Sequence, residues 1–344
     1  MVIIGIDAHK RSHTVVAVDE QGRQLAQRTT GTTSSDHFAL LAWAASHATE
    51  RLWAVEDCRH LSRRLERDLL AAGERIVRVP PKLMANARAA ARSFGKSDPI
   101  DALAVARAAL REPHLPAARL DGQDRELRLL IDHREDLVGE RTRIISRLRW
   151  HLHELDPSLE TAVRSLTHLR NLDTLAAKLT DATGTVARLA RELTDRCRQL
   201  TVKINELEQE LITLVSTLAP SLLAIHGCGP LTAAKILGET AGIDRFHSNH
   251  AYARHNGTAP LPVWSSNRQR HRLSRTGNRQ LNTALHRIAL TQARTHPAAK
   301  TMIARRRAQG DGGLEALRVL KRRLSDVVYR ALLADLQTPH TNAT

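Results

Sequence analysis

Acidic side chains stand at positions in the first third of the chain where they could hold a metal ion. Asp7 and Glu56 each end an apolar run, and Asp98 and Asp101 follow three residues apart in one short segment. A carboxylate at the end of a buried strand lies at a sheet edge, and carboxylates three residues apart share one helix face. Such oxygens are the hard ligands with which Mg²⁺ holds a phosphodiester. The set therefore predicts a magnesium site for phosphodiester chemistry.

Each acid taken alone also has a structural explanation. Asp7 could be a turn residue after a strand, and Asp98 could cap the helix that begins at Pro99. Asp57 competes with Glu56, although Glu56 keeps the alternation of its strand. Their joint position at strand and helix ends of one βα unit favours the metal site.

A serine pair, Ser265 and Ser266, lies in a proline-bounded segment directly before a cluster of arginines. Ordinary turn residues are one explanation, and spacing alone favours it. The other is a nucleophile beside cations that bind a scissile phosphate and stabilise its developing charge. The residues by themselves leave both explanations open.

The charge balance indicates a polyanionic partner. The 344 residues include 52 Lys and Arg against 36 Asp and Glu, which gives a net charge of +16. Nucleic acid is the usual partner of such a chain, and a solvated basic surface is the alternative. Because aromatic residues make up only 3%, contacts to the backbone of DNA or RNA should outweigh base stacking.

Cysteine usage and the start of the chain indicate a cytoplasmic protein. The three cysteines are far apart and the 18 histidines are scattered, so neither a zinc site nor a disulfide framework is expected. Asp7 and Lys10 interrupt the first apolar run, which excludes a signal peptide, and no apolar stretch is long enough to span a bilayer.

Residues 1–115 alternate strands and helices. The predicted strands are Val2–Ile6, Thr14–Val18, Gln24–Thr29, Arg51–Val55 and Arg75–Val79. The predicted helices are Ser35–Ala48, Leu61–Leu70 and Lys82–Arg92. This order is that of a ribonuclease-H-like fold, in which the first and fourth strands are neighbours, so Asp7 and Glu56 should come together.

Residues 116–218 are predicted to form a second, all-helical segment. Apolar residues recur at helical spacing, Asp156-Pro157 breaks the first helix, and a heptad pattern runs from Val186 to Leu218 with charges between. That pattern predicts a coiled coil that joins copies of the chain into a dimer or tetramer. An antiparallel hairpin within one chain is the alternative.

Residues 219–344 are predicted to form a basic, glycine-punctuated helical domain that ends in the helix Leu314–Leu336. Gly227 and Gly229 precede a helix in the manner of a helix-hairpin-helix element, whose turn aims backbone N–H groups at a phosphate. Residues 256–267 are expected to be irregular. The fold class is thus α/β followed by all-α.

Several motifs in this order resemble those of a known family. They are Gly5 to Lys10, Val55 to Asp57, Lys96 to Ala102, Gly227 to Pro230 and Arg270 to Asn282. Together they resemble the DEDD-type insertion-sequence transposases, which have a RuvC-like N-terminal domain and a C-terminal serine domain. These are the RNA-guided bridge recombinases, and the match extends over nearly the whole chain.

The resemblance implies a role for each matched residue. The acids Asp7, Glu56, Asp98 and Asp101 would bind Mg²⁺. A serine would attack DNA and form a covalent phosphoserine link; counting back from the Arg-His-Arg-Leu segment places Ser265 there. Trp264 and Ser266 replace the serine and glycine that usually flank it, and Ser266 is the alternative nucleophile.

The expected partners are the DNA of element ends and target, a non-coding bridge RNA and further copies of the chain, in the nucleoid of a bacterial cytoplasm. The residues expected to contact nucleic acid are Gly227, Gly229, Arg268, Arg270, Arg272, Arg275 and Arg279. The favoured function is a transposase or recombinase. The alternatives are a metal-dependent structure-selective nuclease, similar to a Holliday-junction resolvase, and a non-catalytic DNA-binding protein.

Overall fold

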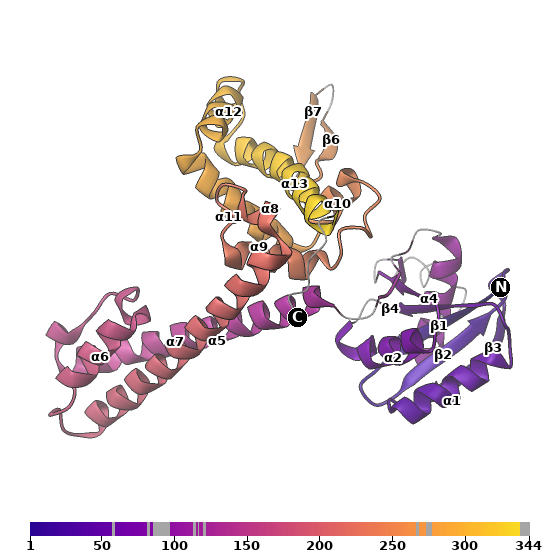
Figure 1. Cartoon of the computed structure of the whole chain (residues 1–344), viewed down its shortest axis with the longest axis horizontal. Helices are drawn as coiled ribbons and strands as arrows, with labels where there is room; N and C mark the ends of the chain where they lie inside the picture. Colours follow the sequence, from indigo (N-terminus) through magenta and orange to yellow (C-terminus); the bar gives the residue numbers. More distant parts are fainter. Residues whose placement is uncertain are drawn as a thin grey trace. The chain divides into compact units, whose positions relative to one another are not determined.

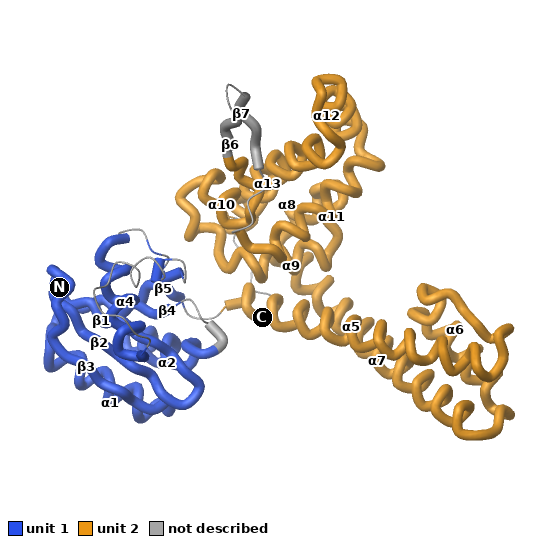
Figure 2. Tube along the Cα trace, turned by 180° about the vertical axis from the view of Figure 1, so that it is seen from behind, with its two compact units in different colours: residues 1–121 blue, residues 122–344 orange. Residues whose placement is uncertain are grey.

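The computed structural model describes residues 1–56, 59–80, 83–84, 97–112, 115, 117–119, 122–265, 268–272 and 277–337, with the backbone alone at 59–60, 262–265 and 268–272. The chain forms two compact units, Met1–Asp121 and Gly122–Thr344 (Figure 2). Each is described by itself below. The division of the second unit into a linker and a C-terminal domain at residue 218 stays a prediction.

Unit 1 is built on a five-stranded mixed sheet (Figure 1). Its strands are β1 (Val2–Ala8), β2 (His13–Val18), β3 (Gln24–Thr30), β4 (Arg51–Glu56) and β5 (Ile76–Val79). The order is β3-β2-β1-β4-β5, with β1 antiparallel to β2 and parallel to β4. The predicted ribonuclease-H-like order, with first and fourth strands adjacent, is confirmed.

Helices cover both faces of this sheet. On one face, α1 (Ser34–Ala45) and α2 (Arg59–Ala71) pack against alternate residues of β1, Ile4 and Ile6. On the other face, α4 (Asp98–Arg111) packs against Ile3. Because side chains alternate along a strand, Asp7 lies on the same face as Ile3, which is the face that α4 covers. The predicted helix Lys82–Arg92 lies outside the described residues except at 83 and 84.

Unit 2 begins with a long helical hairpin. Helices α5 (Gln123–Leu155) and α7 (Thr185–Leu218) pack side by side, and α6 (Leu169–Lys178) lies between them in sequence. Ion pairs join Arg134 to Glu208 and Glu140 to Arg196, so the two helices are antiparallel. As predicted, the helix breaks at Asp156-Pro157: α5 ends at Leu155, and Asp156 is its C-cap.

The heptad seam of α7 is buried inside the chain. Leu200 is 3% exposed and Leu207 is 4% exposed. The structure therefore adopts the intramolecular hairpin, and the expectation that this seam faces a second copy is wrong. The cause is that α5 carries its own apolar stripe, which covers the seam. Oligomerisation through another surface stays a prediction.

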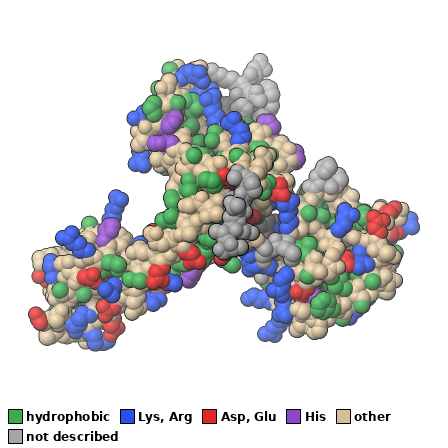
Figure 3. Space-filling view, viewed as in Figure 1, with side chains coloured by type: hydrophobic (Ala, Val, Ile, Leu, Met, Phe, Trp, Pro, Cys, Tyr) green, Lys and Arg blue, Asp and Glu red, His purple; other side chains and the backbone are tan. Residues whose placement is uncertain are grey.

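The remaining helices of unit 2 pack around one core with the base of the hairpin. They are α8 (Pro220–Leu223), α9 (Pro230–Thr240), α10 (Asn249–His255), α11 (Arg279–Thr295), α12 (Pro297–Ala308) and α13 (Gly313–Gln337). The predicted tail helix is confirmed by α13. In Figure 3, Lys and Arg side chains gather over the α12 and α13 end of this unit. No helix among the described residues is long and apolar enough to cross a membrane.

The segment before the arginine cluster differs from its prediction. Strands β6 (Leu261–Ser265) and β7 (Arg268–Arg272) form an antiparallel hairpin where an irregular loop was expected. The prolines at 260 and 262 suggested a loop. In a two-stranded ribbon, however, each strand is an edge strand, where a missing backbone N–H is tolerated.

Candidate metal centre

Strand β1 places the first acid of the site at the end of the sheet where β1 and β4 both finish. Asp7 lies near the end of β1 and is 5% exposed. In the parallel neighbour β4, Val55 is the partner of Ile6, so Glu56 ends its strand beside Asp7 in the register. The prediction that these two positions share one edge of the sheet is confirmed.

The start of α4 supplies two more acids. Ser97 is the N-cap and Asp98 the first helical residue, so the alternative that Asp98 caps this helix is wrong. Asp101 lies one turn later and is 6% exposed, while the side chain of Asp98 is 56% exposed. Acids in the first turn of a helix are stabilised by the positive end of its dipole.

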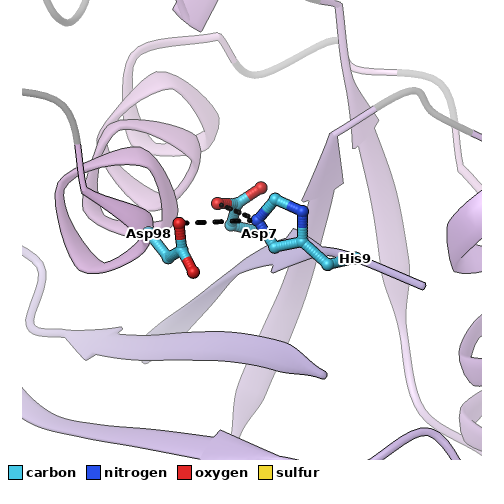
Figure 4. Close-up of side chains that lie close together, drawn as sticks. All are labelled: Asp7, His9 and Asp98. Carbon is cyan, nitrogen blue, oxygen red and sulfur yellow. Dashed lines mark hydrogen bonds and ion pairs between the residues drawn. The ribbon is translucent and has the colours of Figure 1, made fainter. Parts of the chain in front are cut away.

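A histidine joins two of these acids into one cluster. The Nε2 atom of His9 lies 3.1 Å from Oδ2 of Asp7 and 3.6 Å from Oδ1 of Asp98 (Figure 4). One ligand atom from each residue lies within 4.8 Å of the others. Among the described residues, Glu56 and Asp101 lie at the ends of adjoining elements but outside this group.

Electrostatics at Asp7 favour a bound cation. Burial raises the pKa of Asp7 most, and the charges of Asp101 and Asp98 raise it further, whereas His9 lowers it. A carboxylate that is buried beside like charges is costly unless positive charge is near. Two carboxylates and an imidazole make a donor set that fits a divalent cation.

His9 was not among the site residues predicted from the sequence. It stands two residues after Asp7 and directly follows the end of β1, and a two-residue step along an extended chain would set both side chains on one face. That spacing was the available signal. The predicted strand ended at Ile6, so the sequence pattern gave no reason to extend the strand alternation to residue 9.

The predicted nucleophile lies in unit 2. Backbone pairing sets Ser265 opposite Arg268, Val263 opposite Arg270 and Leu261 opposite Arg272. Ser266 and Arg275 lie outside the described residues. The roles of these serines and arginines stay predictions.

The base of this β-hairpin is held by the motif that follows it. An added Cβ at Gly277 would lie 2.3 Å from the backbone nitrogen of Gly257, so the two chain segments touch there. Asn278 caps α11 and donates to Glu239 at 2.6 Å. This part of the Arg-rich motif therefore anchors the two ends of the β-hairpin to the helical core.

The predicted helix-hairpin-helix glycines lie in the turn between α8 and α9. Gly227 has φ +85°, and an added Cβ would lie 3.0 Å from Thr291. Gly229 is the N-cap of α9, with open space around its Cα. Arg279 is exposed at the start of α11. Their contacts with nucleic acid stay predictions.

The sheet order and the acids at its edge define a ribonuclease-H-like domain with a site suited to a divalent cation. A family profile described as a transposase, the DEDD transposase of the IS110 type, matches residues 4–157. A second profile, described as the transposase IS116/IS110/IS902 family, matches residues 219–304. The chain therefore belongs to this family of insertion-sequence transposases, which are enzymes that cut and rejoin DNA.

Relatives match over nearly the full length. The insertion element IS116 uncharacterized 44.8 kDa protein of Streptomyces clavuligerus is 28% identical, covering 96% of this chain and 94% of that protein. The insertion element IS900 uncharacterized 42 kDa protein of Mycobacterium paratuberculosis is 28% identical, covering 99% and 97%. Among solved structures, T. thermophilus RuvC in complex with a Holliday junction substrate is similar over 34% of this chain and 99% of that chain, with 17% identity and a TM-score of 0.28.

Proposed function

We propose that this transposase cuts and rejoins the DNA of an insertion sequence with a Mg²⁺ site in unit 1 and Ser265 as covalent nucleophile. The observation that carries the proposal is the clustering of Asp7, His9 and Asp98 at the C-terminal end of β1, with Asp101 one helical turn after Asp98. A bare DNA-binding protein does not need acids buried beside each other at a sheet edge.

The acids would hold the cation and through it orient a phosphodiester. Asp7 and Asp98 are the proposed ligands within the cluster, and Glu56 and Asp101 complete the acidic set from the adjoining elements. A bound Mg²⁺ would polarise the phosphate and offset its developing charge. The imidazole of His9 contacts both carboxylates and is a third candidate ligand of the cation.

The proposed covalent step is carried by Ser265. Its Oγ forms a bond to phosphorus, the bond from phosphorus to the leaving deoxyribose oxygen breaks, and the hydroxyl proton passes to that oxygen. Arginines of β7 would stabilise the charge on the phosphoryl oxygens. Attack of a second DNA end on the phosphoserine reverses the step, so rejoining needs no ATP.

A non-coding bridge RNA is proposed to choose the DNA sites. Support comes from the resemblance of the motifs to the RNA-guided recombinases and from the net charge of +16, which suits two nucleic-acid partners. Flanking DNA that encodes a segment complementary to the element ends and to the target would agree with this. Transposition without any RNA would contradict it.

Variants separate the metal site from the nucleophile. Asp101→Asn should abolish cleavage with little change in DNA affinity, while Asp181→Asn, at an exposed position in the turn before α7, serves as the matched control. Cleavage at the wild-type rate in EDTA would contradict the metal site.

A suicide substrate on a denaturing gel tests the serine. Ser265→Ala should lose the covalent protein–DNA adduct, and Ser266→Ala should keep it. An adduct that survives in Ser265→Ala and maps to Ser266 moves the nucleophile by one residue. Cleavage without any adduct in the wild-type protein favours a metal-dependent nuclease in which water attacks.

A further inference from the structure

A cavity of about 280 Å³ lies in unit 2 between α11 and α13. Its lining residues belong to unit 2, as does the β6–β7 hairpin, and none of them is an acid of the metal centre in unit 1. Its lining includes three basic side chains and two leucines. The residues around it are Asn282, Thr283, His286, Leu314, Leu317, Arg318 and Lys321.

Lys321 is the unusual residue of this cavity. It is 7% exposed, and its Nζ donates to Oδ1 of Asn282 at 2.5 Å. Over the part of the chain that the structure describes, no carboxylate forms an ion pair with it. Burial of an ammonium beside a neutral amide alone is costly, and burial lowers the pKa of Lys321. The cavity therefore lacks a negative charge that would compensate this lysine.

Two neighbours add to the positive character. Arg318 lies one helical turn before Lys321 and is paired with Glu315 at 3.5 Å, but the two side chains are 39% and 47% exposed, so solvent screens the pair and Glu315 neutralises Arg318 only weakly. His286 faces the cavity from α11, and its pKa is lowered by burial first and by Lys321 second. An anion in the cavity would offset the positive charge of Arg318 and the repulsion between Lys321 and His286.

The position of Lys321 is fixed by a polar network. Asn282 donates through Nδ2 to the backbone carbonyl of Asn256 at 2.9 Å. Asn256 in turn donates to Oγ of Ser325 at 2.8 Å. The ammonium group is thereby tied to the chain segment that leads into the β6–β7 hairpin. A lysine held in this way is preorganised rather than a mobile surface cation.

We infer that this cavity binds a phosphodiester of a nucleic-acid strand, with the phosphate at Lys321, Arg318 and His286 and the sugar against Leu314 and Leu317. The inference takes from the proposed function that the partner is nucleic acid, and it does not depend on the serine or on metal chemistry. A strand held here would be anchored close to the segment that carries the β-hairpin.

The test is binding to single-stranded DNA and RNA oligonucleotides across a salt series, in EDTA and in the Ser265→Ala background. Each phosphate contact contributes about 0.7 to the slope of log affinity against log salt for a single strand. Lys321→Met should lower that slope by about this amount and weaken binding several-fold. Lys300→Met, which removes an exposed charge from α12, should have a smaller effect.

Thermal unfolding controls for damage to the fold. Lys321→Met should not lower the melting temperature, because it removes an uncompensated buried charge. Inorganic phosphate should raise the melting temperature of the wild-type protein more than that of the variant. If Lys321→Met is unstable, Arg318→Gln at the half-exposed rim should still reduce the salt slope.

The outcomes distinguish the possible ligands. A loss confined to RNA or to DNA identifies which strand occupies the cavity. Wild-type slopes in both Lys321→Met and Arg318→Gln would overturn the inference. It would also fail if phosphate stabilised the protein through Lys321 while neither oligonucleotide depended on that residue. If the wild-type protein with Mg²⁺ does not cleave DNA but oligonucleotide binding still depends on Lys321, the result counts against the proposed function alone.

Discussion

Replacement of Gly5 by alanine should damage both the fold and the metal centre. Gly5 lies in the middle of β1, directly beneath α4. An added Cβ would lie 2.2 Å from the carbonyl oxygen of Ala102 and 2.7 Å from Cβ of Ala106. Neither neighbour is the flexible end of a side chain, so α4 would have to move away from the sheet.

The size of the effect follows from this geometry. Forcing an extra methyl group into a well-packed core costs about 1–3 kcal/mol. Since α4 begins with Asp98 and Asp101, its displacement also moves these acids away from Asp7. A displacement of about 1 Å at a catalytic site can cost on the order of 10²-fold in rate. We therefore expect Gly5→Ala to lose both stability and DNA cleavage.

Hydrogen exchange measures the two units separately, which suits this variant. Amides of β1 and α4 should exchange faster in Gly5→Ala, and titration with Mg²⁺ should restore less protection than in the wild-type protein. The matched control is Gly139→Ala in α5, where the nearest atom is 3.5 Å away on the flexible side chain of Arg143. That substitution should stabilise its helix by about 0.5–1 kcal/mol. Wild-type protection and cleavage in Gly5→Ala would refute the close packing of α4 on β1.

Three further substitutions probe charge and packing. The pKa of Asp7 is raised, so protonated Asp7 stabilises the fold at low pH, and this stabilisation is lost as the pH rises from 3.8 through the raised value. Asp7→Asn should therefore be at least as stable as the wild-type protein at neutral pH in EDTA. A lower melting temperature of the variant would contradict this. Leu207→Ala should lower the free energy of unfolding by about 2–5 kcal/mol without changing the mass measured by light scattering. If the substitution instead dissociated an oligomer, the seam would have to lie between two chains. Lys235 lies 2.8 Å from both Asp132 and Glu135, so Lys235→Met should cost up to about 3 kcal/mol. Burial lowers the pKa of Lys235, but its hydrogen bonds and ion pairs with the two carboxylates raise it above 10.5, so the loss should shrink as the pH rises from 10.5 through the raised value; a loss that stays constant there would argue against the ion pairs.

Much of unit 1 was predictable from local patterns. Continuous apolar runs marked β1 and β2, and the order of strands and helices was enough to place β4 beside β1. Asp7 and Glu56 were recognisable because they stand where apolar runs end, and Asp98 and Asp101 because they stand three residues apart in one short segment. Such features depend on the period and the ends of single elements, which neighbouring residues determine.

Other features depended on which elements meet. The heptad seam of α7 would suit a second chain or the same chain equally well, and the apolar stripe of α5 decided between them. The β6–β7 hairpin was hidden because its prolines indicate a loop unless a partner strand is known.

The sequence alone determined the strand order, the acidic residues of unit 1 and the basic character of the chain. Only the tertiary structure decided that His9 lies between Asp7 and Asp98 and that Lys321 is buried beside an amide. The physical reason is that side-chain periodicity is a local property, whereas contacts between distant segments follow from the packing of whole elements. A sequence pattern shows which face of a helix or strand is apolar, but the side chain across from it is known only after the chain has folded.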